Sequence, residues 1–527
     1  MRRADLPRSN LAEPRIPGRS EGRVAAVSAA RPRRDRSFVS LARVGAALAS
    51  LSAASPAAAQ SPPEAPEKLS VGDWQLSPSL QVRVRGEYRR DAPDLGGTDF
   101  FGRQSPRVRD QWVVLERSRV GLGAERGAVR AQITLQDARA LGSPAPTARL
   151  ADERGIGRFE PYEAYAEMRS SGARPNYLRL GRQAVQWGEG RLVGTADFSP
   201  SGRSLDAARG HLALGSFDFE ALAVILEVPG PLGAAFTDTA GPETSGVQLY
   251  GLSASYQVAP LLRVEAFGLA RVSRSNGAEL DGSRFAASRL AGERFTAALR
   301  VSGDGKGWTY GAEGAYQFGA ASSLAIGGTD ISAWAAAAHV SKTLEELVFT
   351  PNFRVAGSYA SGDDRKGVYK QFDPLLADPQ RFHGQMDLFG WSNMMDVAGR
   401  AQIQPATHTS VALEYRWARL AQARGEWIGS YLGAVGSASV PPLVATTPAP
   451  PGPSGSETDL GHELDVVVSY RPWTPLELRA GWSGLLLGDG AKATMAAHAR
   501  GSRLANGAIS PANIAQYAYL QATLTMP

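Results

Sequence analysis

Apolar and polar residues alternate with a period of two along most of the chain after residue 76. In VRAQITLQD, Ile133 and Leu135 occupy one set of alternate positions, and Arg130, Gln132 and Thr134 occupy the other. Strict alternation is typical of a β-strand whose two faces meet different surroundings. The pattern predicts about 18 such strands, near 78–88, 114–124, 128–138, 160–169, 176–186, 205–215, 217–227, 246–258, 261–273, 293–302, 308–318, 330–342, 351–361, 396–404, 408–418, 462–471, 475–485 and 515–525.

Three features favour a membrane barrel over a soluble β-sandwich. The segments run to about ten residues, the length that a tilted strand needs to span a bilayer. The polar rows carry long charged side chains, which a packed sandwich core could not bury unpaired but a water-filled lumen can hold. Trp and Tyr fall near the ends of the apolar rows, where an interfacial girdle would lie: Trp112, Trp308, Tyr310, Trp334, Trp417 and Trp482. The predicted fold is therefore all-β, a transmembrane antiparallel up-and-down barrel.

The connections between the predicted strands come in two lengths. Long stretches rich in Gly, Pro and Asp occur at 140–158, 229–245, 362–395 and 436–461, and short turns such as 258–260 lie between them. Long extracellular loops on one side and short turns on the other are typical of outer-membrane barrels.

The N-terminal region differs from the rest. A basic stretch at 31–36 is followed by an apolar run that ends at Ala57-Ala58-Ala59. This order is typical of a secretory signal, with cleavage expected near Ala59-Gln60; a disordered basic tail on a cytosolic protein would leave the apolar run unexplained. We expect a leader at 1–59, a short periplasmic tether at 60–75 and a barrel at 76–527, located in the outer membrane of a Gram-negative cell.

Removing the leader changes the charge of the chain. Residues 1–59 contain 11 Arg and 4 acidic residues, a net charge of +7, whereas the whole chain carries +6, so the remainder carries −1. The folded part therefore shows no excess of basic residues of the kind that a nucleic-acid partner would require. Cysteine is absent.

Catalytic signatures are weak. The six histidines show no metal-ligand spacing, and GHELD at 461–465 carries only half of the H-E-x-x-H motif. Asp363 and Asp364 could form a cation-binding loop, although a solvated turn is the favoured interpretation. The sequence predicts no catalytic residue, no metal and no cofactor. An enzyme with a Ser–His pair on the barrel wall remains an alternative, because such pairs form in space and sequence spacing does not reveal them. It is the less favoured interpretation, because no motif singles out such a pair.

The arginine positions carry more information. Ten arginines lie on the polar side of their strands and are candidates to line a pore: Arg83, Arg85, Arg117, Arg119, Arg130, Arg179, Arg300, Arg354, Arg416 and Arg479. In a narrow lumen they would form a net-positive constriction that offers bidentate contacts to carboxylates. For most of them individually, pairing with acidic residues on neighbouring strands is the favoured interpretation. Those acids are Glu116, Glu163, Glu167, Glu313, Glu414, Glu463, Asp465 and Glu477.

One segment resembles a known family. LRLGRQAVQWGEGRLVGTADFSPSGRSLDAARG, residues 178–210, is similar to the signature of the alginate export family of outer-membrane barrels. The matching positions are Gly181, Arg182, Gln183, Gly188, Gly190, Arg191, Gly194, Asp197, Phe198, Gly202, Arg203, Asp206 and Arg209. Later stretches also resemble the family: SYASGDD with FDPLLADPQRFHGQMDLFGWSNM, then 461–489, and the closing AQYAYLQATLTMP.

The resemblance implies a monomeric, 18-stranded barrel that exports an anionic uronate polymer through an Arg-rich constriction. It also implies that residues 187–209 pack in or near the lumen, which adds Arg191, Asp197, Arg203, Asp206 and Arg209 to the pore-lining candidates, together with Arg182 from the same motif. For Asp197 and Asp206, the interpretation that their charges hold the segment to the wall is equally favoured. The expected partners are an anionic polysaccharide or small anions, outer-membrane lipid, the barrel-assembly machinery and periplasmic secretion partners. A general or small-anion porin on the same scaffold is the alternative function.

Overall fold

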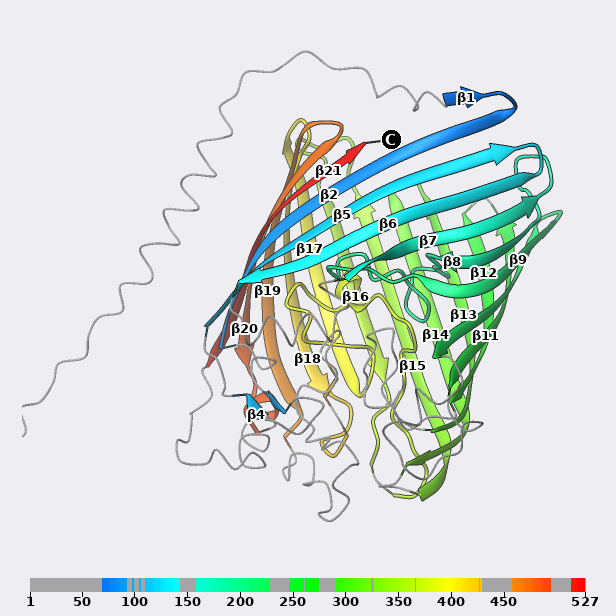
Figure 1. Cartoon of the computed structure of the whole chain (residues 1–527). Helices are drawn as coiled ribbons and strands as arrows, with labels where there is room; N and C mark the ends of the chain where they lie inside the picture. The colour runs from blue at the N-terminus through cyan, green and yellow to red at the C-terminus, as the bar shows by residue number, and fades with distance from the viewer. Residues whose placement is uncertain are drawn as a thin grey trace, which may run out of the picture. The chain divides into compact units, whose positions relative to one another are not determined.

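The computed structural model describes residues 69–91, 97–98, 104–105, 110–142, 158–227, 246–259, 261–273, 291–323, 327–364, 366–425, 427–428, 457–493 and 513–526. The chain divides into two units, Met1–Pro62 and Pro63–Pro527. All the described residues belong to the second unit, which forms a closed barrel (Figure 1).

Eighteen antiparallel strands make the wall of the barrel. They are β2 (Trp74–Arg90), β5 (Asp110–Arg126), β6 (Val129–Gly142), β7 (Arg158–Arg169), β8 (Tyr177–Gln183), β9 (Leu205–Leu214), β10 (Phe217–Glu227), β11 (Val247–Ala259), β12 (Leu262–Ser273), β13 (Ala291–Gly305), β14 (Trp308–Ser323), β15 (Gly327–Thr343), β16 (Asn352–Ala360), β17 (Met394–Ala406), β18 (Thr409–Leu420), β19 (Asp459–Trp473), β20 (Leu476–Leu487) and β21 (Ile514–Met526). Each pairs with the next, and β2 also pairs with β21, which closes the ring.

The predicted barrel of about 18 strands is confirmed, and each predicted segment corresponds to one strand. The predicted strand at 176–186 is shorter than expected, since β8 ends at Gln183. β1 (Leu69–Val71) pairs with the start of β2, so the last residues of the predicted tether at 60–75 form a hairpin. β3 (Gly97–Thr98) and β4 (Gln104–Ser105) form a small separate sheet.

The two faces of the wall have different compositions. On β21, Tyr517, Tyr519 and Gln521 point inward and are buried. Leu520 lies between the last two, points outward, and exposes 62% of its surface. The same alternation leaves Leu252 exposed on β11. An apolar outer face around a closed ring is the arrangement of a transmembrane β-barrel.

Aromatic pairs lie on the outer face near both ends of the barrel. Tyr88 and Trp112, beside the long connections, have ring centroids 4.4 Å apart. Phe217 and Tyr256, beside the short turns, have centroids 4.3 Å apart. Such amphipathic rings are typical of the two membrane–water interfaces. In the described part of the chain, no helix has both the length and the apolar character to cross a membrane.

The short turns all lie at one end of the barrel, together with the start of β2 and the end of β21 (Figure 1). The turn between β13 and β14 shows why such a connection can be short. Lys306 and Gly307 both adopt positive φ, 51° and 73°, the pattern of a two-residue hairpin turn that matches the twist of the strands.

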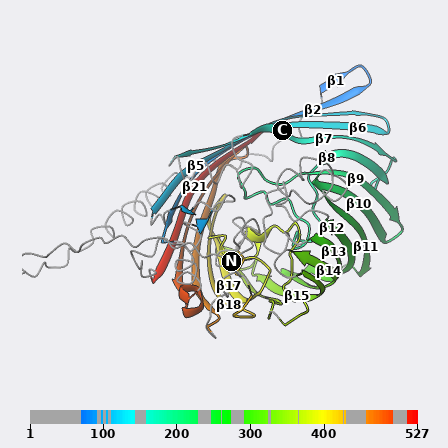
Figure 2. The same ribbon diagram turned by 60° about the horizontal axis from the view of Figure 1, so that its bottom comes forward.

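Two connections fold into the barrel instead of extending from it. The first inward segment, residues 184–204, joins β8 to β9, and the second, residues 361–393, joins β16 to β17. Viewed toward the end with the long connections, both cross the interior (Figure 2). The predicted loop at 362–395 is therefore buried inside the wall, where it contributes Phe372 and Leu388 to the core. Most of 140–158, 229–245 and 436–461 lies outside the described residues.

Candidate functional site

Three wall arginines bind one carboxylate of the first inward segment. Arg117 Nη1 lies 2.9 Å from Asp197 Oδ1, Arg119 Nη1 lies 3.2 Å from the same oxygen, and Arg83 Nη1 lies 3.9 Å from Oδ2. Partial burial opposes ionisation of Asp197, but the charges of Arg117, Arg83 and Arg119 outweigh it and hold the pKa of this carboxyl below its usual value. The Asp197 side chain still exposes 54% of its surface. The segment is thus attached to β2 and β5 through an ion cluster that water can reach.

The same two strands also bind the backbone of the segment. Arg83 donates to the carbonyl of Ser199 at 2.6 Å, and Arg85 donates to the carbonyl of Phe198 at 2.8 Å. The guanidinium of Arg85 stacks 3.9 Å from the centroid of the Phe198 ring, and its other side pairs with Glu87. These arginines therefore bind residues 197–199 to the barrel wall.

Glu189 forms a second attachment, on the opposite side of the segment. Its carboxylate lies 3.1 Å from Arg300 Nη2, 3.5 Å from His339 Nε2 and 3.9 Å from Arg191 Nε. Burial works against ionisation of Glu189, but these three groups together lower the pKa of its carboxyl. Burial also lowers the pKa of Arg191 to about 10, although Glu313 and Glu189 oppose that shift. Arg191 stacks 3.9 Å from the Phe382 ring centroid.

The second inward segment is attached through a fully buried carboxylate. Asp373 exposes none of its surface and lies 2.8 Å from Arg271 Nη1 and 3.5 Å from Arg294 Nε. Gln317 of β14 donates to the carbonyl of Asp373 at 2.7 Å and accepts from its N–H at 2.9 Å. The carboxylate of Asp373 is paired with two arginines, and its backbone N–H and carbonyl are both hydrogen-bonded to Gln317. This part of the segment is therefore fixed to β12, β13 and β14.

Further along, the second segment meets acidic residues of β19. The N–H of Met386 donates to Glu463 at 3.1 Å, and the N–H of Gln385 donates to Asp465 at 3.3 Å. His383 Nδ1 lies 3.8 Å from Asp396, which also pairs with Arg416. Burial lowers the pKa of His383 well below its usual value, with Arg416 and Arg191 adding to the shift. His383 is therefore a neutral, buried residue.

The two inward segments are joined to each other. Val193 and Leu376 form a parallel β-bridge: Gly194 N–H donates to the Leu376 carbonyl at 2.8 Å, and Leu376 N–H donates to the Leu192 carbonyl at 2.9 Å. A side chain at Gly194 would place its Cβ 2.8 Å from the Gly190 carbonyl oxygen, so only glycine fits. Arg203 spans the joint, donating to the carbonyls of Gly194, Leu376 and Ala377.

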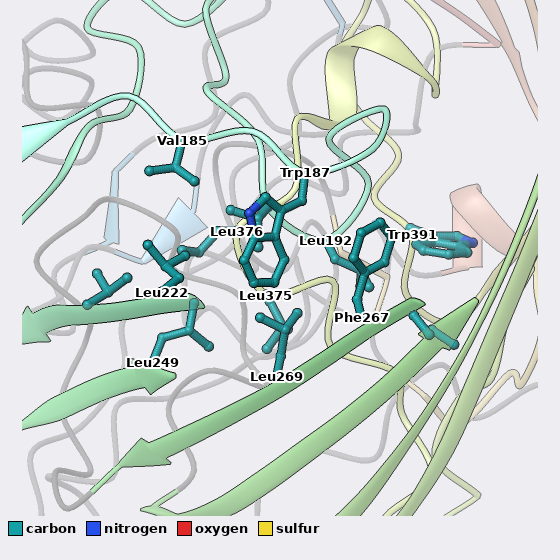
Figure 3. Packing of buried hydrophobic residues seen from close by; sticks show 14 of the residues in the cluster. Val185, Trp187, Leu192, Leu222, Leu249, Phe267, Leu269, Leu375, Leu376 and Trp391 are labelled. Atoms are coloured by element: carbon teal, nitrogen blue, oxygen red, sulfur yellow. The ribbon is translucent and has the colours of Figure 1, made fainter. Parts of the chain in front are cut away.

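Apolar packing fixes the joined segments to one side of the wall (Figure 3). Trp187 and Leu192 of the first segment and Leu375 and Leu376 of the second pack against side chains of the wall such as Phe267. The rings of Trp187 and Phe267 stack with centroids 5.9 Å apart. Burial of these apolar side chains stabilises the packing of the segments against the wall.

Most of the candidate pore-lining residues lie on the inner face or in the inward segments, but they carry partners from the chain. Arg179 pairs with Glu167, Arg209 with Glu220, Arg300 with Glu265, and Arg416 with Asp396 and Glu414. Arg130 is the exception: it lies in register between Glu125 and Glu167 but has no ion pair within 4.0 Å in the described structure. At Arg179, Arg209, Arg300 and Arg416, the arginine therefore pairs with a carboxylate on a neighbouring strand.

Arg182 and Asp206 lie on the outer face of the barrel, not on the inner face. They pair with each other at 3.0 Å, and alternation places them with Leu178, Leu180 and Leu212 on the outer face of β8 and β9. Neither side chain lines the interior, so their assignment to the pore is wrong. The predicted lumen segment 187–209 also extends too far, because residues 205–209 belong to strand β9. Glu116 likewise alternates with the inward-facing Leu115 and Arg117 and lies on the outer face of β5.

Several arginines on the inner face have no carboxylate of the described part of the chain within 4.0 Å, and two of them are neighbours. Arg354 of β16 and Arg400 of β17 are direct register partners and face the interior side by side. Glu189 and Glu414 attract Arg354 electrostatically, and Arg400 and Arg381, the latter at the end of the 3-10 helix η4 (Pro379–Arg381) in the second segment, repel it more weakly. Arg479 of β20 likewise has no ion pair, and its Nε is buried without a hydrogen bond in the described structure.

Sequence reasoning missed several of these residues. Arg271, Arg294 and Arg400 lie on the polar side of predicted strands and could have been found by the same alternation rule. Asp373 lies between two positions of the family-like FDP stretch, Phe372 and Pro374, but nothing in the spacing indicates its partners on β12 and β13.

The Asp363-Asp364 pair is used within the chain. Asp364 lies 2.8 Å from Lys370 Nζ, and Asp363 accepts from the Lys370 N–H at 3.3 Å. The hydrogen bond from Lys370 lowers the pKa of Asp364. Within the described ranges, no group of three His, Asp or Glu side chains is placed to hold a metal ion.

Solved structures with a similar chain trace have low sequence identity. OpdQ of Pseudomonas aeruginosa matches with a TM-score of 0.49 and 11% identity, covering 86% of this chain and 98% of that chain. OccK8 (OprE) of P. aeruginosa gives 0.49 and 9%, with the same coverage. The outer membrane protein opdK of P. aeruginosa gives 0.47 and 11%, covering 85% and 98%. No curated protein matches the chain in sequence.

The family comparison is more specific than these structural similarities. A family model described as alginate export matches residues 74–503, a range that begins at the first residue of β2 and includes both inward segments. With a closed 18-stranded barrel already established by strand pairing, the match places this barrel among outer-membrane channels. The chain belongs to the alginate export family.

Proposed function

We propose that the protein is a passive outer-membrane channel that exports an anionic polysaccharide of the uronate type. The observation that carries this proposal is the pair Arg354 and Arg400, two cations in direct register on the inner wall without a carboxylate within 4.0 Å in the described structure. Like charges directly opposite each other on neighbouring strands are destabilising. A passing carboxylate would relieve that repulsion.

The other inner arginines are less suited to bind a substrate, because carboxylates of the chain already neutralise them. Arg117 is paired with Asp197, and Arg271 with Asp373. Arg354, Arg381, Arg400 and Arg479 instead have no ion pair within 4.0 Å among the described residues, although Glu414 lies in register with Arg400, and three of these arginines lie on the wall from β16 to β20. Guanidinium groups bind carboxylates through two parallel hydrogen bonds, so this wall is our proposed path for the polymer.

The proposal includes a route to the membrane. The leader at 1–59 would direct export, with cleavage near Ala59-Gln60, and the barrel-assembly machinery would insert the mature chain. Flow through the barrel would be driven from outside the protein, since the sequence carries no nucleotide-binding loop. We propose no catalytic step, and a monomer as the functional unit.

One observation favours a smaller cargo. The two inward segments cross the interior and are joined to each other by the Val193–Leu376 bridge, which narrows the space left for a polymer. A small-anion porin on the same scaffold is therefore the second candidate function. It would use the same arginines with a shorter anion.

Planar-bilayer recording tests both candidates. The full mature chain should conduct anions in preference to cations, and an oligouronate added on the short-turn side should block the current. The variant Arg354→Gln/Arg400→Gln/Arg479→Gln should lose anion preference and most of the block. Arg139→Gln serves as the matched control, because Arg139 lies on the outer face paired with Asp137. Anion preference without block supports the small-anion porin, and unchanged selectivity in the triple variant would overturn both.

A further inference from the structure

A cleft on the inner wall is separate from the proposed polymer path. Its volume is about 600 Å³, within the range of ~300–1,000 Å³ that is usual for ligand sites. Residues of β9 to β13 form its wall, and Gln186, Trp187 and Gly188 of the first inward segment cover it. Arg174, in the short turn between β7 and β8, also lines it. The arginines of β16 to β20 do not line it.

The charges of the cleft balance. Arg174, Arg263 and Arg300 line it together with an equal number of carboxylates, those of Asp218, Glu220 and Glu265. Arg174 pairs with Asp218, and Arg300 pairs with Glu265. Because neither sign is in excess, the cleft offers no net attraction to a polyanion or to a polycation.

The pairing fixes the polar groups in place. Glu220 accepts hydrogen bonds from Trp187 Nε1 and from Arg209, and Arg263 donates to the Ser255 hydroxyl at 2.8 Å. The buried Nε of Arg263 has no hydrogen-bond partner in the described structure, although Glu265 lies 3.5 Å away. The lining thus presents guanidinium groups, which only donate, beside carboxylates, which only accept. A hydroxyl group can satisfy both, since it donates once and accepts twice.

Apolar surface completes the lining. Trp187 and Phe267 stack on each other, are more than nine-tenths buried, and both line the cleft (Figure 3). Because the two rings cover each other and leave less than a tenth of their surface exposed, they contribute a small apolar edge beside the polar groups. A C–H group of a sugar ring can contact this edge, and the sugar hydroxyls are complementary to the mixed donors and acceptors.

We propose that this cleft binds a neutral, hydroxyl-rich ligand of one or two sugar rings. The site is distinct from the anion path: it lies on the wall from β9 to β13, has balanced charge, and includes Arg174 of a short turn. A neutral sugar would bind there by hydrogen bonds to Arg263, Ser253 and Glu265 and by packing near Trp187 and Phe267.

Calorimetric titration of the detergent-solubilised full chain tests the proposal. Maltose, a neutral disaccharide, should bind saturably, and digalacturonate, of the same size with two carboxylates, should neither bind at this site nor compete. Ser253→Phe places a ring in the cleft without removing an ion pair, and should weaken maltose binding at least about tenfold. Ser469→Phe is the matched control, because Ser469 lies on the inner side of β19, outside the cleft, and should leave binding unchanged.

Three results would overturn the proposal. They are the absence of a saturable signal from maltose, unchanged maltose binding by Ser253→Phe, and competition by digalacturonate for the site. Anion selectivity in bilayers is a separate readout, so a failed titration leaves the proposed channel function standing, and a failed selectivity test leaves the sugar site standing. Heat-modifiable migration of both variants in gel electrophoresis establishes that each barrel has folded.

Discussion

Asp373 and Arg271 form a buried ion pair, 2.8 Å apart, that fixes the second inward segment to strand β12. Neither group has access to water: Asp373 exposes none of its surface and Arg271 exposes 5%. Arg294 lies on the other side of the same carboxylate at 3.5 Å. One carboxylate thus compensates two buried cations, and the position of the segment depends on it.

Replacing Asp373 with alanine should release the second segment. The change leaves Arg271 and Arg294 buried without their carboxylate, a cost of about 3–5 kcal/mol for a broken buried pair. The segment should then leave its place, and single-channel conductance in planar bilayers should rise. Asp137→Ala is the control, since Asp137 pairs with Arg139 on the outer face and holds no inward segment. Equal conductance of the two variants would contradict the assigned role of Asp373.

Acid should act on the first segment only below the usual titration range of aspartate. The pKa of Asp197 in the folded chain lies below its ordinary value of 3.8. Its pairing with the arginines is therefore fully present above that ordinary value, and is lost as the pH falls through the lower folded pKa. The attachment through Asp197 should therefore stay intact from pH 7 to about pH 4, and its loss should appear as a step in conductance at lower pH.

Asp197→Asn provides the comparison for this pH series. Its side chain carries no charge at any pH, so its conductance should be raised already at pH 7 and should show no step on acidification. A step at the same pH in both proteins would show that another group controls the change. Recordings from pH 3 to 7 at constant ionic strength would separate these cases.

The joint between the inward segments can be tested by cross-linking. The chain contains no cysteine, so Val193→Cys/Leu376→Cys introduces the only pair. Neighbouring strands lie about 4.8 Å apart, within the ~4.4–6.8 Å that a disulfide spans between Cα atoms. The pair should oxidise readily, and the oxidised protein should conduct like the unmodified chain, because the bridge already holds these residues together. Non-reducing mass spectrometry and bilayer recording would measure the two effects.

Val193→Cys/Leu388→Cys is the matched control for the cross-link. Leu388 is as buried as Leu376 but belongs to a different apolar cluster, so its thiol should not reach residue 193. Equal oxidation of both pairs would contradict the assigned bridge. Loss of current after oxidation of the first pair would show that the segments separate during conduction.

The membrane face can be tested on a single strand. Leu520 points outward from the middle of β21 with 62% of its surface exposed, and Thr523 points inward on the same strand. Leu520→Arg should lower the free energy of unfolding in lipid vesicles by about 2–4 kcal/mol, the usual effect of arginine at the bilayer midplane. Thr523→Arg should change it much less. Equal effects in denaturant titrations would mean that the two faces are assigned incorrectly.

The sequence predicts the strands of the barrel wall far better than the contacts of the segments inside it. Val82 and Val84 alternate with Arg83 and Arg85, and that alternation alone determines which side chains face inward. It does not indicate that Arg83 binds the carbonyl of Ser199, which is 116 residues away in the sequence. Strand periodicity encodes a direction for each side chain but not a partner. Interior contacts of this kind depend on how the inward segments fold.

Arg182 illustrates the opposite error. The alternation of Leu178 and Leu180 already places Arg182 on the outer face. The family-like motif, however, runs through the end of β8, the first inward segment and the start of β9. It therefore contains charged side chains on the outer face of the wall as well as charged side chains in the interior. Where a motif crosses a strand end, the strand periodicity is the better guide to the direction of each side chain.

The two attachments of the inward segments differ in their access to solvent. At 1 M salt the Debye length falls to about 3 Å, compared with about 8 Å at physiological ionic strength, and exposed pairs are screened while buried ones change little. The half-exposed Asp197 cluster would weaken under those conditions, whereas Asp373 and the apolar cluster around Trp187 would hold. Recordings made in concentrated electrolyte would therefore observe a channel whose attachment to β2 and β5 through Asp197 is weakened, while the buried attachments of the second segment to β12–β14 and β19 remain.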